Sequence, residues 1–300
     1  MRATHLSWQH ALLAVSVVAI WGTNFPVMKI AMEQVPPLLL AALRFLFVLF
    51  PAVFFVKKPD VPWRQLALYG LFIGVGQFGL IYHAVNGWIS PGLASLVIQT
   101  QVFFTIFLAV LLKGETVRTH QWAGLALAAA GIVLIGLNIG GDTTAFGIGL
   151  TLAAGLSWAC GNIVGKAAGS ANMLAYVVWA SIFSVIPLAA LSLVFEGWPL
   201  ISQSLAEADV WAWLAVLWQS CGNTLFGYAI WGWLLTRYPA AVVAPISLLV
   251  PVFGMASSAL WLGEPLQIWK IAAAVLVIGG LTLNMVWPVS RFIAPQAPAG

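Results

Sequence analysis

The chain has 300 residues, of which 62% are hydrophobic and only 7% are charged, and its formal net charge is +4 at pH 7. Soluble globular proteins carry about 25% charged residues, so this composition excludes a water-soluble domain and indicates a protein whose main solvent is lipid. The 12 Lys and Arg residues do not cluster, which excludes the basic surface that nucleic-acid binding requires.

Ten apolar segments are long enough to cross a bilayer, because a hydrocarbon core of about 30 Å needs about 20 residues of helix. In chain order, the predicted spans cover residues 8–31, 37–56, 65–87, 91–113, 119–138, 147–168, 171–195, 209–235, 240–262 and 267–288. The first is predicted to be a span rather than a cleaved signal peptide, because no A-x-A site ends it. The longest connection is 196–208, and residues 289–300 are predicted to form a disordered cytoplasmic tail.

The Lys and Arg residues give these spans an orientation. If the N-terminus is cytoplasmic, nine of them lie at cytoplasmic ends: Arg2, Lys57, Lys58, Arg64, Lys113, Arg118, Lys166, Arg237 and Arg291. Only Lys29 and Lys270 lie at outer ends, and Arg44 lies within a span. This asymmetry follows the positive-inside rule, so we expect both termini in the cytoplasm.

Two pairs of motifs occur in the same order in both halves of the chain. "WGTNFPVMK" begins at Trp21 and "WACGNIVGK" begins at Trp158, and each places a lysine eight residues after the tryptophan. "KGETV" around Glu115 corresponds to "LGEPL" around Glu264. Spans one to five therefore resemble spans six to ten.

An odd number of spans per unit turns the second unit upside down in the membrane. The predicted fold class is thus an all-α integral membrane protein of ten transmembrane helices, arranged as two inverted five-helix repeats over residues 8–138 and 147–288. Secondary transporters commonly have this layout, with the binding site at the repeat interface near mid-membrane.

Several predicted spans carry polar side chains near the bilayer midplane, where such groups are costly unless they are paired or wetted. The predicted layer consists of Arg44, Gln77, Gln99, Gln101, Gln219, Asn223, Asn24 and Asn162. No carboxylate joins it. For the amides the alternative is a hydrogen bond to a neighbouring helix, and for Arg44 it is structural pairing with carbonyl groups.

Prolines interrupt two of the spans near this layer. Pro26 in span one and Pro245 and Pro251 in span nine each free a carbonyl and permit a kink, so they are candidate gating positions, with static kinks as the alternative. His83 is predicted to be a buried histidine with satisfied hydrogen bonds rather than a proton relay.

Catalytic and metal-binding motifs are missing from the sequence. H-E-x-x-H, G-x-S-x-G and the P-loop are absent, and Cys160 and Cys221 are predicted to be small buried side chains rather than parts of a disulfide or zinc site. We therefore expect no enzyme activity, no metal and no cofactor.

"WGTNFPVMK" in span one, "LAALRF" in span two and "SPGLASLVIQTQVFFTIFLAVLLKGE" across span four resemble the EamA family of the drug/metabolite transporter superfamily. The likeness covers residues 8–288. The resemblance implies a bacterial inner-membrane carrier that exports small amino-acid metabolites, such as cysteine or O-acetylserine, by alternating access. It also implies a central cavity lined by spans one to four and six to nine.

In the resulting hypothesis, Arg44 attracts the carboxylate of an amino-acid zwitterion and the amide side chains hydrogen-bond it. The faces of Trp21 and Trp158, or carbonyls freed by the prolines, would hold the ammonium group. The expected partners are this small solute and the lipid bilayer, and coupling to protons is left open. The alternatives are export of aromatic or other amino acids or of drugs on the same fold, and a membrane scaffold that transports nothing.

Overall fold

The structure is a computed structural model that describes residues 6–113, 119–167 and 172–293. In these ranges all regular elements are helices, with a single isolated bridge between Gly140 and Thr143. The predicted all-α class is therefore confirmed.

The first half of the chain forms α1 (Trp8–Ala31), α2 (Pro37–Leu49), η1 (Ala52–Phe54), α3 (Trp63–Gly70), η2 (Leu71–Gly79), α4 (Leu80–Val85), α5 (Pro91–Val97), η3 (Ile98–Thr100), α6 (Gln101–Lys113) and α7 (Thr119–Leu137). The second half forms α8 (Ala145–Lys166), α9 (Met173–Ala180), α10 (Ile182–Phe195), α11 (Trp198–Glu207), α12 (Val210–Leu217), η4 (Trp218–Phe226), α13 (Gly227–Arg237), α14 (Ala240–Val243), η5 (Ala244–Leu249), α15 (Val250–Leu262) and α16 (Ile268–Ile293). Of the η elements, η2 and η4 are π-helices and the others are 3₁₀-helices.

Within the described residues, eight helical runs are long and apolar enough to cross a membrane. They are Trp8–Ala31, Pro37–Phe54, Trp63–Val85, Pro91–Leu112, Thr119–Leu137, Ala145–Lys166, Met173–Phe195 and Ala244–Leu262. The eighth and tenth predicted spans are not among these eight. The run from α12 through α13 is continuous helix but rich in tryptophan and polar residues, and the apolar part of α16, Ile268–Asn284, is shorter.

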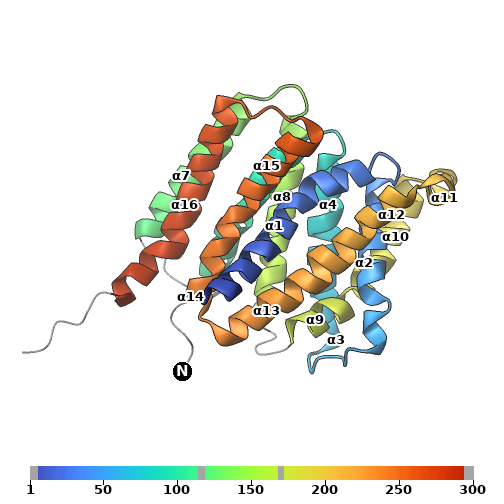
Figure 1. The fold of residues 1–300 in the computed structure, drawn as a ribbon, viewed down its shortest axis with the longest axis horizontal. Coiled ribbons are helices and arrows are strands. Elements are labelled where there is room, and N and C mark those ends of the chain that lie inside the picture. The colour runs from blue at the N-terminus through green and yellow to red at the C-terminus, as the bar shows by residue number, and fades with distance from the viewer. Residues whose placement is uncertain (1–5, 114–118, 168–171, 294–300) are drawn as a thin grey trace, which may run out of the picture.

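Helices that are distant in the sequence pack side by side. α1 packs against α15, α2 against α10, α6 against α8, and α7 against α16. In Figure 1, α7 and α16 lie together at one edge of the molecule and α11 lies at the opposite edge. The elements that carry the predicted polar layer lie between these two edges.

Glycines allow two of these pairs to approach closely. A Cβ at Gly22 of α1 would lie 2.6 Å from Phe253 Cβ and from Val250 O of α15. A Cβ at Gly280 of α16 would lie 2.4 Å from Gly124 O of α7. Small residues at helix crossings in membranes bring backbones together in this way, so both crossings depend on the glycines.

The connection 196–208 contains a helix that the sequence does not signal by hydropathy. Gly197 adopts φ 81°, and Pro199 sits in the first turn of the ten-residue helix α11. Trp198 and Leu200 are exposed while Ile201 and Ser204 are buried. The exposed side of this helix therefore carries large apolar side chains.

Two predictions about individual segments need comment. α16 extends through residues 289–293, which the sequence places in a disordered tail, and residues 294–300 lie outside the described residues. The prediction that both cysteines are buried is wrong for Cys221, which is exposed, whereas Cys160 is partly buried. An outward-facing thiol is compatible with a lipid-facing surface because cysteine behaves as a small hydrophobe.

Candidate functional site

Arg44 is the centre of a buried polar network. Its side chain on α2 is only 1% exposed, and its Nη2 donates to Asn223 Oδ1 at 2.6 Å and to Thr224 Oγ1 at 2.9 Å. Nη1 donates to Tyr82 Oη at 3.3 Å. One guanidinium thus joins α2, α4 and η4 through neutral partners only.

The network continues beyond the guanidinium. The Tyr82 hydroxyl donates to Gln219 Oε1, and Ser220 Oγ donates to the backbone carbonyl of Arg44 at 3.0 Å. The guanidinium carbon lies 3.9 Å from the centre of the Phe78 ring, a cation–π contact. Each of these contacts fixes the position of the charge between α2, η2 and η4.

The π-helix η4 presents its groups to this network. Thr224 Oγ1 donates to Gln219 O at 3.0 Å, five residues back along the chain. Trp21 Nε1 of α1 donates to Asn223 O at 3.0 Å. π-Helical turns are rare and concentrate at functional sites because they widen the helix and reorient backbone groups. Here the widened turn supplies a carbonyl to α1 and two side chains to Arg44.

A second polar pair joins α8 and α6. Asn162 Nδ2 donates to Gln101 Oε1 at 2.9 Å, and Thr105 Oγ1 lies 3.5 Å from the same nitrogen. Asn162 and Gln101 are both partly buried. The structure therefore brings two predicted site residues together here, in a pair separate from the Arg44 network.

The other predicted residues have individual positions. Gln77 and Asn24 are buried, and each has a side-chain oxygen without a hydrogen-bond partner. Gln99 is buried in η3. Trp158 is partly buried on α8 and packs against the hydrophobic core. The layer predicted from the sequence is thus divided between one connected network, one pair and several separate side chains.

The predicted gating prolines lie in α1 and at the start of two elements of span nine. Pro26 is buried inside α1, Pro245 is in the first turn of η5 and Pro251 is in the first turn of α15. The 3₁₀ turn η5 lies directly before α15, so span nine changes its helical geometry where its prolines lie.

Sequence reasoning missed several hydroxyl-bearing residues around Arg44. They are Tyr82, Thr224, Ser181, Ser184, Tyr69 and Tyr228, all next to Arg44 or lining the same small cavity. A signal was present for the two serines, because they lie three residues apart on one face of a predominantly apolar span. Thr224 directly follows the predicted Asn223.

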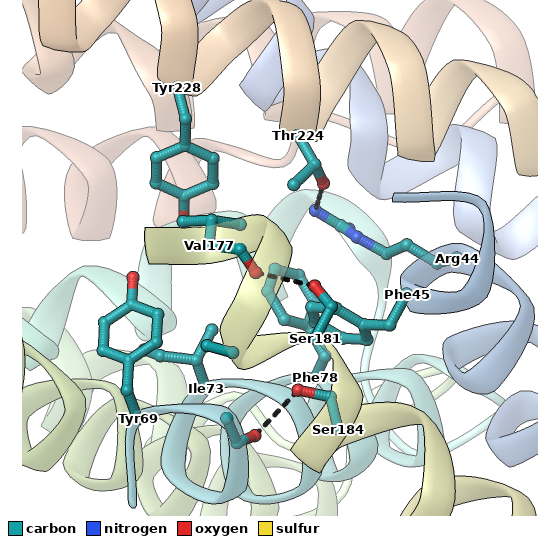
Figure 2. A pocket seen from close by; sticks show the side chains of 12 residues that line it. Arg44, Phe45, Tyr69, Ile73, Phe78, Val177, Ser181, Ser184, Thr224 and Tyr228 are labelled. Carbon is teal, nitrogen blue, oxygen red and sulfur yellow. Dashed lines mark hydrogen bonds between the residues drawn. The ribbon is translucent and has the colours of Figure 1, made fainter. Parts of the chain in front are cut away.

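Of two cavities among the described residues, one borders this network. A small one of about 10 Å³ lies beside Arg44 (Figure 2). A wide one of about 720 Å³ lies where α1 ends and α2 begins, and α4, α10 and α11 contribute to its walls. Glu33, His83 and Glu196 line the wide cavity, and His83 is exposed there. The prediction of a buried His83 is therefore wrong, because its face of α4 borders this opening.

The described ranges contain no group of three or more His, Cys, Asp or Glu side chains that could hold a metal ion. The central network offers one cation, amides, hydroxyls and aromatic rings. Such a set can bind an anionic or zwitterionic solute by charge and hydrogen bonds.

Comparisons with known proteins identify the family that the chain resembles. The profile of the EamA-like transporter family matches residues 8–137 and 145–286. A protein of Salmonella typhimurium described as a probable amino-acid metabolite efflux pump is 45% identical over 93% of this chain and 96% of its own length. Its counterpart in Escherichia coli, with the same description, is 43% identical over the same shares.

More distant matches extend the picture. An uncharacterized transporter of Bacillus subtilis is 26% identical over 90% of this chain and 94% of its own. One crystal structure matches with a TM-score of 0.62 at 18% identity, covering 96% of this chain and 99% of that one; at this identity the likeness concerns the fold alone. From the family match and the near full-length relatives it follows that the chain belongs to the EamA-like transporter family, and that it is a multi-pass membrane transporter rather than an enzyme.

Proposed function

We propose that this chain exports small amino-acid metabolites, of the cysteine or O-acetylserine kind, across the bacterial inner membrane by alternating access. The observation that carries the proposal is Arg44, a buried cation whose hydrogen-bond partners in the described residues are all neutral. Two relatives that match nearly the whole chain are described as probable amino-acid metabolite efflux pumps, and an amino acid supplies the carboxylate that Arg44 lacks.

The proposal includes ten spans in two inverted five-helix repeats, residues 8–138 and 147–288. The run from α12 through α13 would be span eight and α16 would be span ten. Support comes from the family profile, which matches the chain twice, at 8–137 and 145–286. Further support comes from the irregular turns, because π-helices occur in predicted spans three and eight and 3₁₀ turns in predicted spans four and nine.

Helix packing supports the same symmetry. α1 packs on α15 and η4, and α8 packs correspondingly on α6 and η2. α2 packs on α10, and α7 packs on α16. If each helix is replaced by its counterpart in the other proposed repeat, every one of these contacts becomes either another contact of the set or the same contact. A twofold relation between repeats produces this pattern.

Orientation in the proposal follows the positive-inside rule, with both termini in the cytoplasm. Under this assignment Lys57 and Lys58 lie at the cytoplasmic side and Glu196 lies at the outer side. The wide cavity would then be an outer vestibule. His83 lines that vestibule and not the Arg44 network. It therefore does not place a titratable group beside the charge of Arg44 for proton coupling.

For the transport step, the substrate carboxylate would replace Asn223 and Thr224 as partners of Arg44. Gln77, Gln99, Gln101, Gln219, Asn24 and Asn162 would hydrogen-bond the solute, and Trp21 and Trp158 would hold its ammonium group by cation–π contact. The cavity of about 10 Å³ beside Arg44 is far smaller than the roughly 300–1,000 Å³ of ordinary ligand sites. The repeats must therefore move apart to admit a solute, and Pro26, Pro245 and Pro251 would be the points of bending.

The test is counterflow in proteoliposomes with labelled cysteine, O-acetylserine and aromatic amino acids. We expect saturable exchange of an amino-acid metabolite by the wild type, and at least tenfold slower exchange by Arg44→Gln, because a hydrogen bond to a charged group contributes about 1.5–3 kcal/mol. The matched control is Arg64→Gln, which removes an exposed arginine at the start of α3 and should exchange at the wild-type rate.

The same experiment separates the alternatives. Exchange of aromatic amino acids or drugs without exchange of cysteine or O-acetylserine would change the proposed substrate class but keep the carrier mechanism. Folded protein with no exchange of any solute would favour the membrane scaffold and contradict the proposal. Equal exchange by Arg44→Gln and the wild type would remove Arg44 from the site.

A further inference from the structure

The wide cavity of about 720 Å³ lies where four of the runs that can cross a membrane begin or end. Its lining includes residues at or directly beyond the ends of Trp8–Ala31, Trp63–Val85 and Met173–Phe195, and at the start of Pro37–Phe54. Such helices leave the hydrocarbon core at their ends. α11, which forms part of the wall, lies at an edge of the molecule (Figure 1). The cavity therefore opens at the level of the lipid head groups.

Polar and apolar side chains line different depths of this cavity. With the exception of His83, its polar lining residues all lie beyond the ends of the spans: Glu33, Gln34, Asn86, Glu196 and Ser204. The lining residues within the spans are otherwise apolar, and they include Val75, Leu80 and Leu191. Val75 lies roughly 10–15 Å of helix before the end of its span at Val85, at a rise of about 1.5 Å per residue. The walls thus change from polar to apolar toward the hydrocarbon, as the bilayer itself does.

The charged groups at the polar end are mainly carboxylates. Among the described residues that line the cavity, Glu33 and Glu196 are acidic, His83 is the basic one, and none is Lys or Arg. Glu196 already accepts from two backbone N–H groups at the start of α2 and from Ser192 Oγ. Glu33 is exposed and is in no ion pair within the described ranges. It is therefore the carboxylate that remains free for a cationic ligand.

We infer that this cavity binds a membrane phospholipid whose head group carries a primary ammonium. The ammonium donates hydrogen bonds to the Glu33 carboxylate, and His83 and Asn86 can donate to the phosphate. One acyl chain lies along the apolar wall that includes Val75 and Leu191. The volume is within the roughly 300–1,000 Å³ of ordinary ligand sites. The inference goes beyond the proposed function and does not depend on which solute is exported.

Head-group chemistry makes the site selective. A choline head group carries a cation but has no N–H to donate, and a glycerol head group carries no cation. The test is the thermal unfolding midpoint of the delipidated full-length protein in detergent, titrated with phosphatidylethanolamine, phosphatidylcholine or phosphatidylglycerol of identical acyl chains. A ligand that binds only the folded state raises the midpoint with a saturable concentration dependence. We expect phosphatidylethanolamine to half-saturate at a severalfold lower concentration than the other two.

Two variants with matched controls assign this effect to the cavity. Glu33→Gln should abolish the preference for phosphatidylethanolamine over phosphatidylcholine, whereas Glu207→Gln, which removes an exposed carboxylate of α11 outside the lining, should retain it. Leu191→Trp fills the apolar end and should weaken binding of all three lipids. Leu193→Trp, at a half-exposed position of α10 outside the lining, should leave their binding unchanged.

The lipid origin of the ligand has its own control. Glycerophosphoethanolamine, which has the same head group without acyl chains, should not raise the midpoint in the same concentration range, and an equal rise would overturn the inference by making the ligand water-soluble. Equal half-saturating concentrations for the three lipids, or an undiminished preference in Glu33→Gln, would overturn it as well. None of these measurements uses counterflow, so failure of the transport proposal leaves the inference intact.

Discussion

At the residue scale, the centre of this protein is the positive charge of Arg44, which is held by neutral hydrogen-bond partners. Arg44 donates to Asn223, Thr224 and Tyr82, and a planar guanidinium can hold several acceptors at once in fixed directions. Neutral partners can be exchanged for an anionic one at a net gain in electrostatic energy. The same contacts that close the network thus leave it open to competition by a carboxylate.

Tyr82 tests how far this network stabilises the closed state. Tyr82→Phe removes the hydroxyl that donates to Gln219 and accepts from Arg44. Both partners are buried, and leaving buried polar groups unpaired costs about 1–3 kcal/mol each. We expect a lower thermal unfolding midpoint in detergent.

The matched control for Tyr82→Phe is Tyr176→Phe. The Tyr176 hydroxyl makes a single long bond of 3.4 Å to Gln65 O, outside the Arg44 network, so its removal should lower the midpoint less. Equal midpoints for the two variants would show that the network contributes nothing beyond an ordinary buried hydroxyl.

Sequence reasoning located the charge but not its full surroundings. Arg44, Gln219 and Asn223 stand out because cations and amides are rare in apolar spans. Tyr82 and Thr224 do not stand out, because hydroxyl groups in membrane helices usually hydrogen-bond to the backbone of their own helix. Their presence in a span therefore does not indicate a functional site. Which hydroxyl meets the guanidinium is decided by the relative positions of three helices, and a single sequence does not contain that information.

At the element scale, helix irregularity is the feature that sequence reasoning captured least. Prolines signal the interruption of span nine, but the π-helices η2 and η4 contain no proline at all. Groups from other helices accompany them: Ser157 donates to Phe72 O at 2.8 Å, and Trp21 donates to Asn223 O at 3.0 Å. A π turn stabilised by contacts between helices depends on tertiary structure, so local pattern does not predict it.

Two carboxylates of the second half bind the starts of first-half helices. Glu196 accepts from Leu38 N and Leu39 N at 2.6 and 3.0 Å at the start of α2. Glu264 accepts from Gly92 N at 3.0 Å at the start of α5. A carboxylate at a helix N-terminus satisfies free N–H groups and complements the helix dipole. These contacts tie the two halves together at the ends of their helices.

The Glu264 contact gives an element-scale prediction. Glu264 also pairs with Lys270 at 2.9 Å, and their side chains are only 7% and 8% exposed. Glu264→Gln leaves a buried lysine without its counter-ion, which costs about 3–5 kcal/mol. We expect a clear drop in the unfolding midpoint.

A double variant isolates the charge as the cause. Glu264→Gln combined with Lys270→Met removes both members of the pair, so it should be more stable than Glu264→Gln alone. If the stability losses caused by Glu264→Gln and by Lys270→Met simply add in the double variant, the pair is not coupled. The carboxylate then acts only as a helix cap.

At the scale of the whole molecule, hydropathy predicts where the chain crosses the membrane better than it predicts how many crossings there are. Eight of the predicted spans are long and apolar enough within the described residues. The run from α12 through α13 is not, since it carries the polar groups of η4 and several tryptophans. The helix that contributes most to the Arg44 network is therefore among those that resemble a membrane span least, which is expected when polar residues line a central site.

The prediction at the scale of the whole molecule is that the two repeats have opposite orientations in the membrane. Glu33 follows α1 and Lys166 ends α8, and both side chains are exposed. If the repeats are inverted, the ends of these equivalent helices lie on opposite sides of the membrane. In a background with Cys160→Ser and Cys221→Ser, a membrane-impermeant thiol reagent added to intact cells should label Glu33→Cys and leave Lys166→Cys unlabelled until the cells are opened. Labelling of both from outside would make the repeats parallel, and a carrier that rocks between inverted halves could not be built from them.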